Sequence, residues 1–141
     1  MVEIATTDDE LRECYPVIVE LRPHIDTVEK FIAQVHRQRE LGFQLAYIRD
    51  ETRVRAVAGY RIDEALAWGK FMYVYDLVTS ALCRSHGYGK ELLDWLADVA
   101  RQHQCGQLHL DSGVQRFDAH RFYLRERMDI TSHHFAKKLT P

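Results

Sequence analysis

The sequence predicts one α/β domain whose mixed, twisted β-sheet is flanked by about four helices, and three observations support this prediction. Segments with the apolar pattern of strands interleave along the chain with segments whose apolar residues recur at helical spacing. The 141 residues are enough for one domain with a sizeable core, and no linker or repeat divides them. The composition, 46% hydrophobic and 28% charged, is that of a globular protein. We therefore expect a single domain over residues 1–141.

The N-terminal part of the chain is expected to form a short strand and then a helix. The strand covers residues 2–6, VEIAT, and the helix begins at a cap formed by Thr7 or Asp8. Apolar residues recur in this helix at intervals of three and four, which is the period of one helix face. Pro23 should end the helix, because a proline disfavours the helical conformation of the residue before it.

A second helix and three strands should follow. The helix begins at Asp26 or Thr27 and fades by Gly42, which is expected to be a C-terminal cap. The strands have alternating or continuous apolar residues and cover residues 43–49, 53–63 and 70–80. The third strand is apolar on both faces, which is typical of a strand in the centre of a sheet.

The apolar period changes back to that of a helix after the third of these strands. The remaining elements are expected to be a helix from Tyr88 to near Gly106, a strand over 107–112, a short helix over 117–127 and a last strand over 129–139. Residues 70–111 then form a strand–helix–strand unit. The two strands of such a unit are expected to lie parallel in the sheet.

Charge and cysteine content argue against several classes of protein. The net charge of −2 gives no global field that would attract nucleic acid or an anionic membrane. The start of the chain, MVEIATTDDELRE, is acidic and lacks the apolar core of a signal peptide. No segment approaches the roughly 20 apolar residues of a membrane span. The three cysteines are odd in number and form no close pair, which favours free thiols in a reducing cytoplasm.

Two glycines, Gly87 and Gly89, stand between the third long strand and the following helix. A helix that starts directly after a strand presents free amides and the positive end of its dipole, which together favour a phosphate. Glycine lets the backbone curl and lets an anion approach closely. Arg84 and Lys90 add positive charge at the two ends of the loop, and Ser85 adds a hydroxyl. The stretch lacks the Walker pattern and the third glycine of a dinucleotide fingerprint.

The remaining pattern is R-x-x-G-x-G, from Arg84 to Gly89, and four other stretches accompany it: DLVT, LLDWL, LDSG and AHRFY. In type and order these resemble the acyl-CoA pyrophosphate loop and its neighbours in the GNAT superfamily of N-acetyltransferases. The resemblance covers almost the whole chain. It implies a GNAT-like fold and transfer of an acetyl group from acetyl-CoA to a primary amine by direct attack within a ternary complex. The expected acceptor is a small molecule or an amino-acid-like amine.

The same resemblance implies which residues bind the co-substrate. The pantetheine arm is expected to pair with the strand before the loop, and the pyrophosphate is expected to bind the amides of the loop. The residues implied are Leu77, Val78 and Thr79 for the arm, and Arg84, Ser85, His86, Gly87, Tyr88, Gly89 and Lys90 for the pyrophosphate. The side chain of His86 either contacts phosphate or faces solvent. The family also has its sheet split open just after this strand, at a bulge, so that the thioester reaches the acceptor.

Two residues are candidates for catalysis. Tyr123 stands in AHRFY, where the family's general-acid tyrosine commonly lies, and a phenol of pKa ~10 can donate a proton to the departing thiolate. Its alternative role is that of a core tyrosine. Asp76 lies in the apolar stretch FMYVYDLV, where burial raises the pKa of a carboxyl towards a useful range. Asp76 is either the proton acceptor for the amine or a hydrogen-bonded structural acid.

Three further patterns concern the edges of the site. Asp111 and Ser112 end the strand after the long helix, where they either orient a substrate or form a turn. The eight histidines are scattered without an H-x-x-x-H pattern, and no cysteine pair supports zinc, so no metal site is predicted. Arg127-Met128 stands where the family often has a glycine and an aromatic residue. The turn there is therefore expected to avoid a positive φ.

Other functions are compatible with the same residues. The chain could be a non-catalytic acyl-CoA-binding regulatory module, or a transferase that acts on a protein or aminoacyl-tRNA amine. The net charge of −2 argues against tRNA. A subset of the arginines, including those in RVRAVAGYR, could meet an anionic acceptor. Relatives in the family often pair through sheet edges or the last strand, and FAKKL could serve in this way, so a homodimer is expected.

Overall fold

The computed structural model describes residues 1–84 and 86–141, which divide into two compact units, residues 1–110 and 111–141. The elements of the first unit are β1 (Val2–Ile4), α1 (Asp8–Leu21), α2 (Val28–Arg39), β2 (Gln44–Arg49), β3 (Val54–Ala65), β4 (Gly69–Thr79), the 3-10 turn η1 (Ala81–Cys83), α3 (Tyr88–Gln102) and β5 (Gln107–Leu110). The second unit contains α4 (Phe117–Arg125). The expectation of one domain over residues 1–141 stays a prediction.

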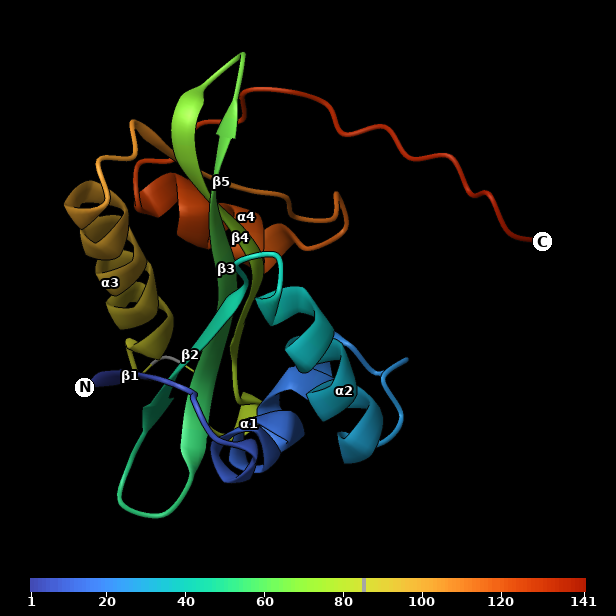
Figure 1. Ribbon diagram of the computed structural model, residues 1–141. Coiled ribbons are helices and arrows are strands. Elements are labelled where there is room, and N and C mark those ends of the chain that lie inside the picture. The colour runs from blue at the N-terminus through green and yellow to red at the C-terminus, as the bar shows by residue number, and fades with distance from the viewer. Residues whose placement is uncertain (85) are drawn as a thin grey trace. The chain divides into compact units, whose positions relative to one another are not determined.

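The five strands lie in the order β1-β2-β3-β4-β5 (Figure 1). Neighbouring strands are antiparallel from β1 to β4, whereas β4 and β5 are parallel. Because α3 connects the parallel pair, the strand–helix–strand unit predicted over residues 70–111 is confirmed. The sheet is therefore mixed, and β4 lies inside it, between β3 and β5, as its apolar sequence requires.

Local hydrogen bonds explain where the first two helices begin and end. Thr7 forms a capping box with Glu10, in which each backbone amide donates to the other residue's side-chain oxygen at 3.2 Å. The Thr27 hydroxyl accepts a hydrogen bond from the Lys30 amide at 3.1 Å at the start of α2. Beyond the end of α2, Gly42 has φ +97°, the left-handed conformation that closes a helix. Both helix starts and the glycine cap were predicted, and all three are confirmed.

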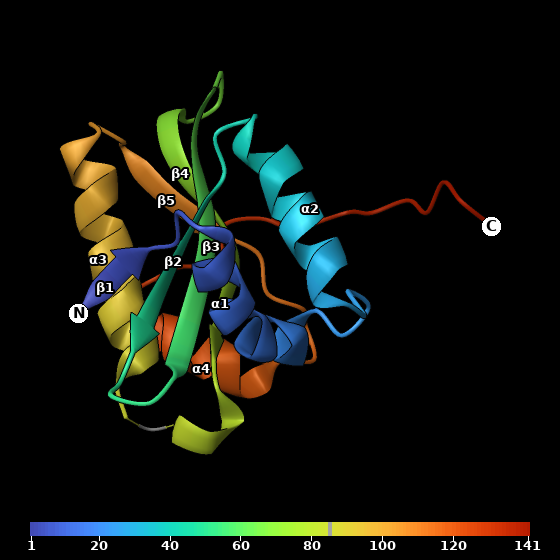
Figure 2. The same cartoon turned by 60° about the horizontal axis from the view of Figure 1, so that its bottom comes forward.

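The two faces of the sheet bury separate apolar cores. On one face, α1 and α2 cover side chains that include Leu45, Val57 and Val78. On the other face, α3 covers side chains that include Met72 and Val74. Figures 1 and 2 both show α1 and α2 on one side of the sheet and α3 on the other. Alternate residues of a strand therefore enter different cores, as the two-residue period of a strand dictates.

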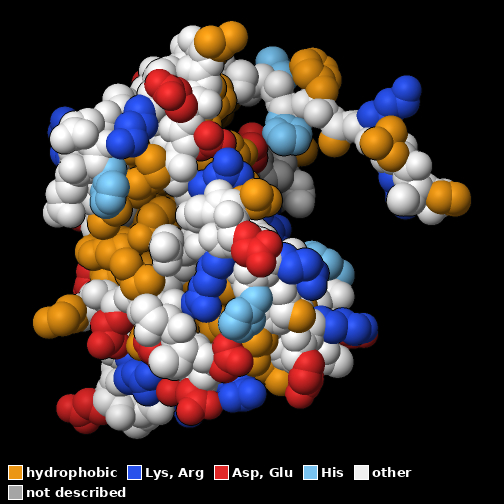
Figure 3. Space-filling model, in the orientation of Figure 1, with side chains coloured by type: hydrophobic (Ala, Val, Ile, Leu, Met, Phe, Trp, Pro, Cys, Tyr) orange, Lys and Arg blue, Asp and Glu red, His pale blue; other side chains and the backbone are white. Residues whose placement is uncertain are grey.

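The surface in the view of Figure 3 has no region of a single charge sign around the helices of the first unit. Lysines, arginines and acidic residues are mixed over α1 and α2, and apolar side chains gather beside α3. Tyr88, Trp95 and Val99 of α3 are only partly buried against the core on that side. The mixture of charges agrees with the net charge of −2.

The second unit corrects two predictions. Residues 126–141 form neither helix nor strand, so the last strand predicted over 129–139 is wrong. A strand needs a neighbour for its hydrogen bonds, and the apolar residues Ile130 and Phe135, an odd number of positions apart, would lie on opposite faces. Arg127 has φ +64°, so the expectation that this turn avoids a positive φ is also wrong. The Met128 amide donates to the Tyr123 carbonyl at 3.0 Å, and this helix-closing turn requires a left-handed residue.

Candidate active site

The two halves of β4 differ in their neighbours. The first half, Phe71–Val74, pairs with β3 on one side and with β5 on the other. After Val74 the pairing with β5 stops, and only the pairing with β3 continues to the end of the strand. Over residues 75–79, the edge of β4 that faces away from β3 has no strand partner among the residues that the structure describes. The residues implied for the pantetheine arm, Leu77, Val78 and Thr79, lie on this open segment.

A β-bulge marks the change between the two halves. Tyr60 of β3 is opposite Val74, but the preceding residue, Gly59, is opposite Asp76, so Tyr75 is an extra residue in β4. An ideal Cβ on Gly59 would lie 2.5 Å from Oδ2 of Asp76 and 2.5 Å from Cζ of Phe43, so the close approach of the carboxylate and of the ring together requires glycine. The opening of the sheet therefore begins within β4, and not after its end as expected.

Asp76 is held by Arg22, the residue that caps the C-terminal end of α1. Arg22 Nε donates to Oδ1 of Asp76 at 2.9 Å, and Arg22 Nη2 donates to the Tyr75 carbonyl at 2.8 Å. The Asp76 side chain is 16% exposed. Burial raises the pKa of its carboxyl, and the Arg22 guanidinium opposes this rise without cancelling it. Asp76 is thus a structural ion-pair partner whose pKa is also shifted in the direction that a base requires.

The loop after β4 is attached to neighbouring elements through its backbone. The Ser80 amide donates to the Arg55 carbonyl of β3 at 2.7 Å, and the Ala81 amide donates to Glu20 of α1 at 2.9 Å. The thiol of Cys83 is buried, with its Sγ 3.6 Å from the Ser80 carbonyl oxygen. These contacts fix residues 80–83, the start of the loop, relative to β3 and α1.

Gly87 lies where this loop joins α3. It is the N-cap residue, with φ 80° and ψ 7°, a left-handed conformation that other residues rarely adopt. A Cβ at this position would meet nothing within 4 Å, so the requirement for glycine is conformational. The Glu91 amide donates to the Gly87 carbonyl at 3.0 Å and closes the first helical turn. The amides of that turn then point out of the positive end of the helix, where an anion is favoured.

The other residues implied for the pyrophosphate adjoin this helix start. Arg84 and His86 are exposed in the loop, and Nδ1 of His86 lies 2.8 Å from the Cys83 carbonyl oxygen. The first residues of α3 are Tyr88, Gly89 and Lys90. Ser85 lies outside the described residues. The structure thus places the described members of the motif after the C-terminal end of β4, the half of the strand that does not pair with β5.

The second unit contains the remaining predicted site residues. Tyr123 lies in α4 and is half-buried, and burial raises the pKa of its phenol while the charge of Arg116 acts in the opposite direction. The phenol is therefore protonated at neutral pH, and its catalytic role stays a prediction. Asp111 Oδ1 lies 3.3 Å from Nδ1 of His134. Ser112 Oγ is buried without a hydrogen-bond partner among the described residues.

Sequence reasoning missed two features of this site, the partner of Asp76 and the position of the expected bulge within β4. The partnership of Arg22 with Asp76 joins positions that are 54 residues apart, and no local pattern predicts it. The bulge at Tyr75 depends on the register between β3 and β4. A signal for the bulge does exist in the sequence, because Gly59 interrupts a strand and an isolated glycine in a strand often marks a bulge or a close approach.

Comparison with known proteins identifies the family. Residues 4–128 match the family described as "Acetyltransferase (GNAT) family". The chain belongs to the GNAT acetyltransferases. It is 40% identical over 128 residues to the uncharacterized N-acetyltransferase YhdJ of Bacillus subtilis, with 89% of this chain and 88% of the relative covered. A shorter match, 36% identical over 66 residues, covers 47% of this chain and 43% of the aminoalkylphosphonate N-acetyltransferase of Salmonella typhimurium.

The GNAT fold is also found by comparison with solved structures. A crystal structure of an acetyltransferase from Trypanosoma brucei is similar with a TM-score of 0.83, at 17% identity and with 99% of both chains covered. The predicted α/β fold with a mixed sheet and the resemblance to the GNAT superfamily are both confirmed. As a member of a family whose relatives are named N-acetyltransferases, the protein is an acyltransferase.

Three features make up the candidate site of this GNAT protein: the open edge of β4, the start of α3 and the Arg22–Asp76 pair. In the part of the chain that the structure describes, no group of three or more His, Cys, Asp or Glu side chains could hold a metal ion. Within the same residues, every helix is too short or too polar to pass through a bilayer.

Proposed function

We propose that this GNAT protein transfers the acetyl group of acetyl-CoA to the primary amine of a small molecule, by direct attack within a ternary complex. The observation that carries the proposal is the open edge of β4, which runs from the loop before α3 back to the bulge at Tyr75. A positive helix end that follows an open strand edge along the chain suits a ligand that has a pyrophosphate followed by an amide-containing arm.

Residues of the first unit would hold the co-substrate along this path. The amides from Arg84 to Lys90 would bind the pyrophosphate, and the free edge of Leu77–Thr79 would pair with the pantetheine arm as an added strand does. The site fits such a group because an ideal Cβ on Gly87 would meet no atom within 4 Å, so there is open space beside this residue. Acetyl-CoA supplies a thioester, an acyl group activated toward amines.

Two side chains would handle the protons. An alkyl amine of pKa ~10.4 is almost entirely protonated at neutral pH, and the ammonium form has no lone pair for attack. Asp76, whose pKa is raised by burial, accepts the proton of the ammonium group. Tyr123 gives its proton to the departing sulfur. One N–C bond forms and one C–S bond breaks, which leaves an amide and a thiol. The second proton that the nitrogen loses replaces the one that Tyr123 gave to the sulfur, and the proton held by Asp76 returns to solvent.

A small acceptor is favoured over a protein or tRNA amine by two observations. The shorter of the two sequence matches is to an enzyme named for aminoalkylphosphonates, which are small amines. The net charge of −2 provides no field to attract tRNA. Asp111 and Ser112 are the candidates in the second unit for orienting the acceptor.

The test is incubation of the full chain with acetyl-CoA and a panel of primary amines, with release of free thiol as the readout. Release that depends on the amine, with the acetylated product seen by mass spectrometry, is the expected result. Binding of acetyl-CoA without release for any amine would identify the chain instead as an acyl-CoA-binding regulatory module.

The role of Tyr123 is tested by Tyr123→Phe, which removes the proton donor and keeps the ring. The expected result is a fall in kcat of roughly 10²- to 10⁴-fold, the usual contribution of general acid catalysis, with unchanged affinity for coenzyme A. Turnover at the wild-type rate would show that another group protonates the sulfur. Thermal unfolding of the variant controls for loss of the fold.

We also propose that the protein forms a homodimer through its C-terminal segment. Phe135 and Leu139 are 91% and 88% exposed, and in an extended chain they would share one face. Exposed apolar side chains on an unpaired extended segment suit addition to the sheet edge of a second copy. Light scattering should give the mass of two chains for the full protein and of one chain for Phe135→Glu, and a monomeric wild type would contradict the proposal.

A cytoplasmic location is proposed from the thiols. Cys14 and Cys83 are buried free cysteines, and Cys105 is a third, half-buried one. Free cysteines suit a reducing compartment. Cell fractionation tests this location, and recovery of the protein outside the cytoplasmic fraction would contradict it.

A further inference from the structure

A row of three side chains crosses the sheet next to the bulge. In register, Arg61 of β3 is opposite Tyr73 of β4, and Tyr73 is opposite His109 of β5. Their neighbours along the chain, including Tyr60 and Val74, enter the core under α3. Because side chains alternate along a strand, the row lies on the opposite face of the sheet, the one that α1 and α2 occupy.

Aromatic rings border this row. Tyr75, the bulged residue, is 42% exposed, and its ring centroid lies 4.8 Å from that of Tyr73 and 6.1 Å from that of Phe43. At the other end, Trp68 stacks on His109 with ring centroids 3.8 Å apart and planes inclined by 19°. The row is therefore a polar strip lined by aromatic side chains, and its residues do not belong to the apolar core on this face.

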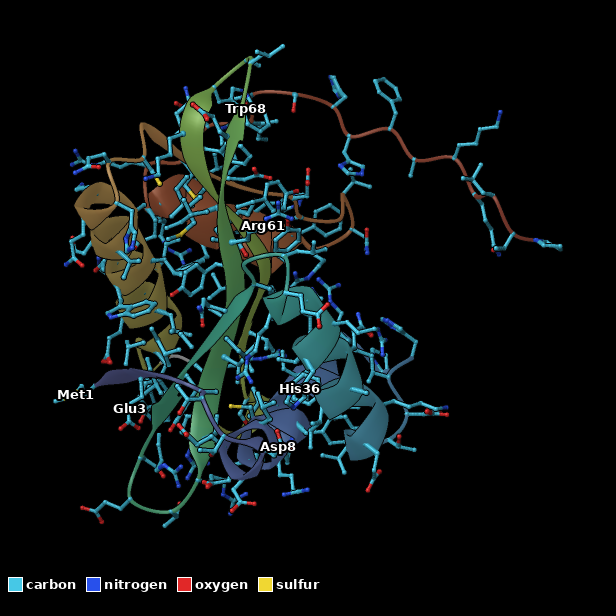
Figure 4. The ribbon with its side chains drawn as sticks, in the orientation of Figure 1. Met1, Glu3, Asp8, His36, Arg61 and Trp68 are labelled. Carbon is cyan, nitrogen blue, oxygen red and sulfur yellow. The ribbon has the colours of Figure 1, made fainter. Side chains whose placement is uncertain are left out.

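Within the part of the chain that the structure describes, one hydrogen-bond donor of Arg61 has no acceptor. Its Nη2 lies 3.2 Å from Oδ2 of Asp63, but the Asp63 side chain is 43% exposed, and such surface pairs are weak. Its Nε is buried and has no hydrogen-bond partner among the residues that the structure describes. Figure 4 shows Arg61 between the C-terminal end of α2 and the β3–β4 turn where Trp68 lies. A buried unpaired donor is costly, and an acceptor supplied by a ligand would remove that cost.

The location of Arg61 suits a substrate that approaches from the end of β4 opposite to the acyl donor. The loop for the pyrophosphate follows the C-terminal end of β4, whereas the row crosses its N-terminal half. Tyr73 precedes Tyr75 by two residues, about 7 Å along the strand, and Arg61 is one strand away, about 5 Å. A small molecule with its amine at Asp76 can therefore place a second group at Arg61. Arg22, which also lies near Asp76, is already occupied by Asp76 and the Tyr75 carbonyl.

We propose that the acceptor is a small primary amine that carries an anionic group, a phosphonate, phosphate or carboxylate, and that Arg61 binds this anion. The inference rests on the proposed acetyl transfer and adds the class of substrate to it. A guanidinium binds such oxyanions through paired, charge-assisted hydrogen bonds, and Nε with Nη2 is one face of that fork. The rings of Tyr73 and Tyr75 pack against the carbon chain between the amine and the anion.

The test compares three amines of similar length: aminoethylphosphonate, β-alanine and propylamine. Steady-state thiol release should give a kcat/KM for the better anionic amine that exceeds that for propylamine by roughly 10- to 100-fold, because charge-assisted hydrogen bonds are the strong ones. The phosphonate and carboxylate arms show which anion the site prefers. Equal kcat/KM for all three amines would overturn the anion site and leave the proposed acetyl transfer standing.

Substitutions test whether Arg61 causes the preference for anionic amines over propylamine. Arg61→Met should lower kcat/KM for the anionic amine by the same roughly 10- to 100-fold, so that its advantage over propylamine disappears, and Arg61→Lys should restore part of it. Arg53→Met, which removes an exposed arginine in the β2–β3 turn, is the matched control and should keep the preference. An equal loss for charged and neutral amines in Arg61→Met would mean a structural role and overturn the inference. If no amine is acetylated, the proposed function fails and this inference fails with it.

Discussion

The two halves of β4 belong to one strand but differ in what surrounds them. Phe71–Val74 is paired on both sides and contains Met72, which is fully buried. The second half is paired on one side only, and it contains the bulge at Tyr75 and the ion-paired Asp76. Backbone groups need partners, so an open strand edge is a place where a ligand can supply them. The comparison shows that one extra residue, Tyr75, separates the half of the strand that pairs within the sheet on both sides from the half whose open edge can bind a ligand.

The largest expected effect on stability is that of a substitution in the first half of β4, Phe71–Val74, which is paired on both sides. Met72→Ala removes a side chain that is 0% exposed in the core under α3, and it should lower the free energy of unfolding by about 2–5 kcal/mol. Urea denaturation measures this change. Thr79→Ala, at the end of the open half, is the control and should cost about 1 kcal/mol or less. Equal losses at the two positions would contradict the division of the strand into two halves.

The next prediction distinguishes a loss of coenzyme A binding from the backbone strain that any side chain at a left-handed glycine causes. Gly87→Ala and Gly69→Ala both place a Cβ on a left-handed residue with open space around it, so each should cost about 1–2 kcal/mol of stability. Gly87 starts α3 and Gly69 starts β4, so only Gly87→Ala should weaken coenzyme A binding, by roughly tenfold for about 1.4 kcal/mol of lost interaction. Calorimetric titration with coenzyme A measures the affinity of both variants. A similar loss of affinity in both variants would point to strain and not to the loop.

The smallest expected effect is the contribution of the Asp76 carboxyl to the pH dependence of stability. The raised pKa of Asp76 means that the folded protein binds this proton more tightly than the unfolded chain does. The contribution of Asp76 to stability therefore declines as pH rises from the unfolded value of ~3.9 through the higher folded pKa. Asp76→Asn should remove this decline, so unfolding free energies measured across that window should fall less with rising pH in the variant than in the wild type. A greater fall in the variant would mean that Arg22 lowers the pKa of Asp76 below its ordinary value.

Local patterns were enough to predict much of the fold. The helix starts at Thr7 and Thr27 and the glycine cap at Gly42 depend on hydrogen bonds and backbone angles within a few residues. The motif around Gly87 likewise predicted the helix that begins at Tyr88, although the 3-10 turn η1 lies between it and β4. Such features are encoded where they form, so sequence patterns reveal them.

Long-range features could not be predicted in this way. The Arg22–Asp76 pair and the bulge opposite Gly59 depend on how distant segments meet. The last strand failed as a prediction because strand character depends on a partner, which residues 129–139 do not have among the residues that the structure describes. Arg127 shows a related limit, because the hydrogen bonds that close α4 impose a positive φ on a residue that does not favour it.

The most direct test of the central claim is amide hydrogen exchange along β4, measured with and without coenzyme A. The claim is that the open edge of residues 77–79 pairs with the pantetheine arm while Phe71–Val74 is already paired on both sides. Coenzyme A should therefore slow exchange within residues 77–79 and at the start of α3, and leave exchange over Phe71–Val74 unchanged. Saturating coenzyme A that changes no amide in residues 77–79 would contradict the account.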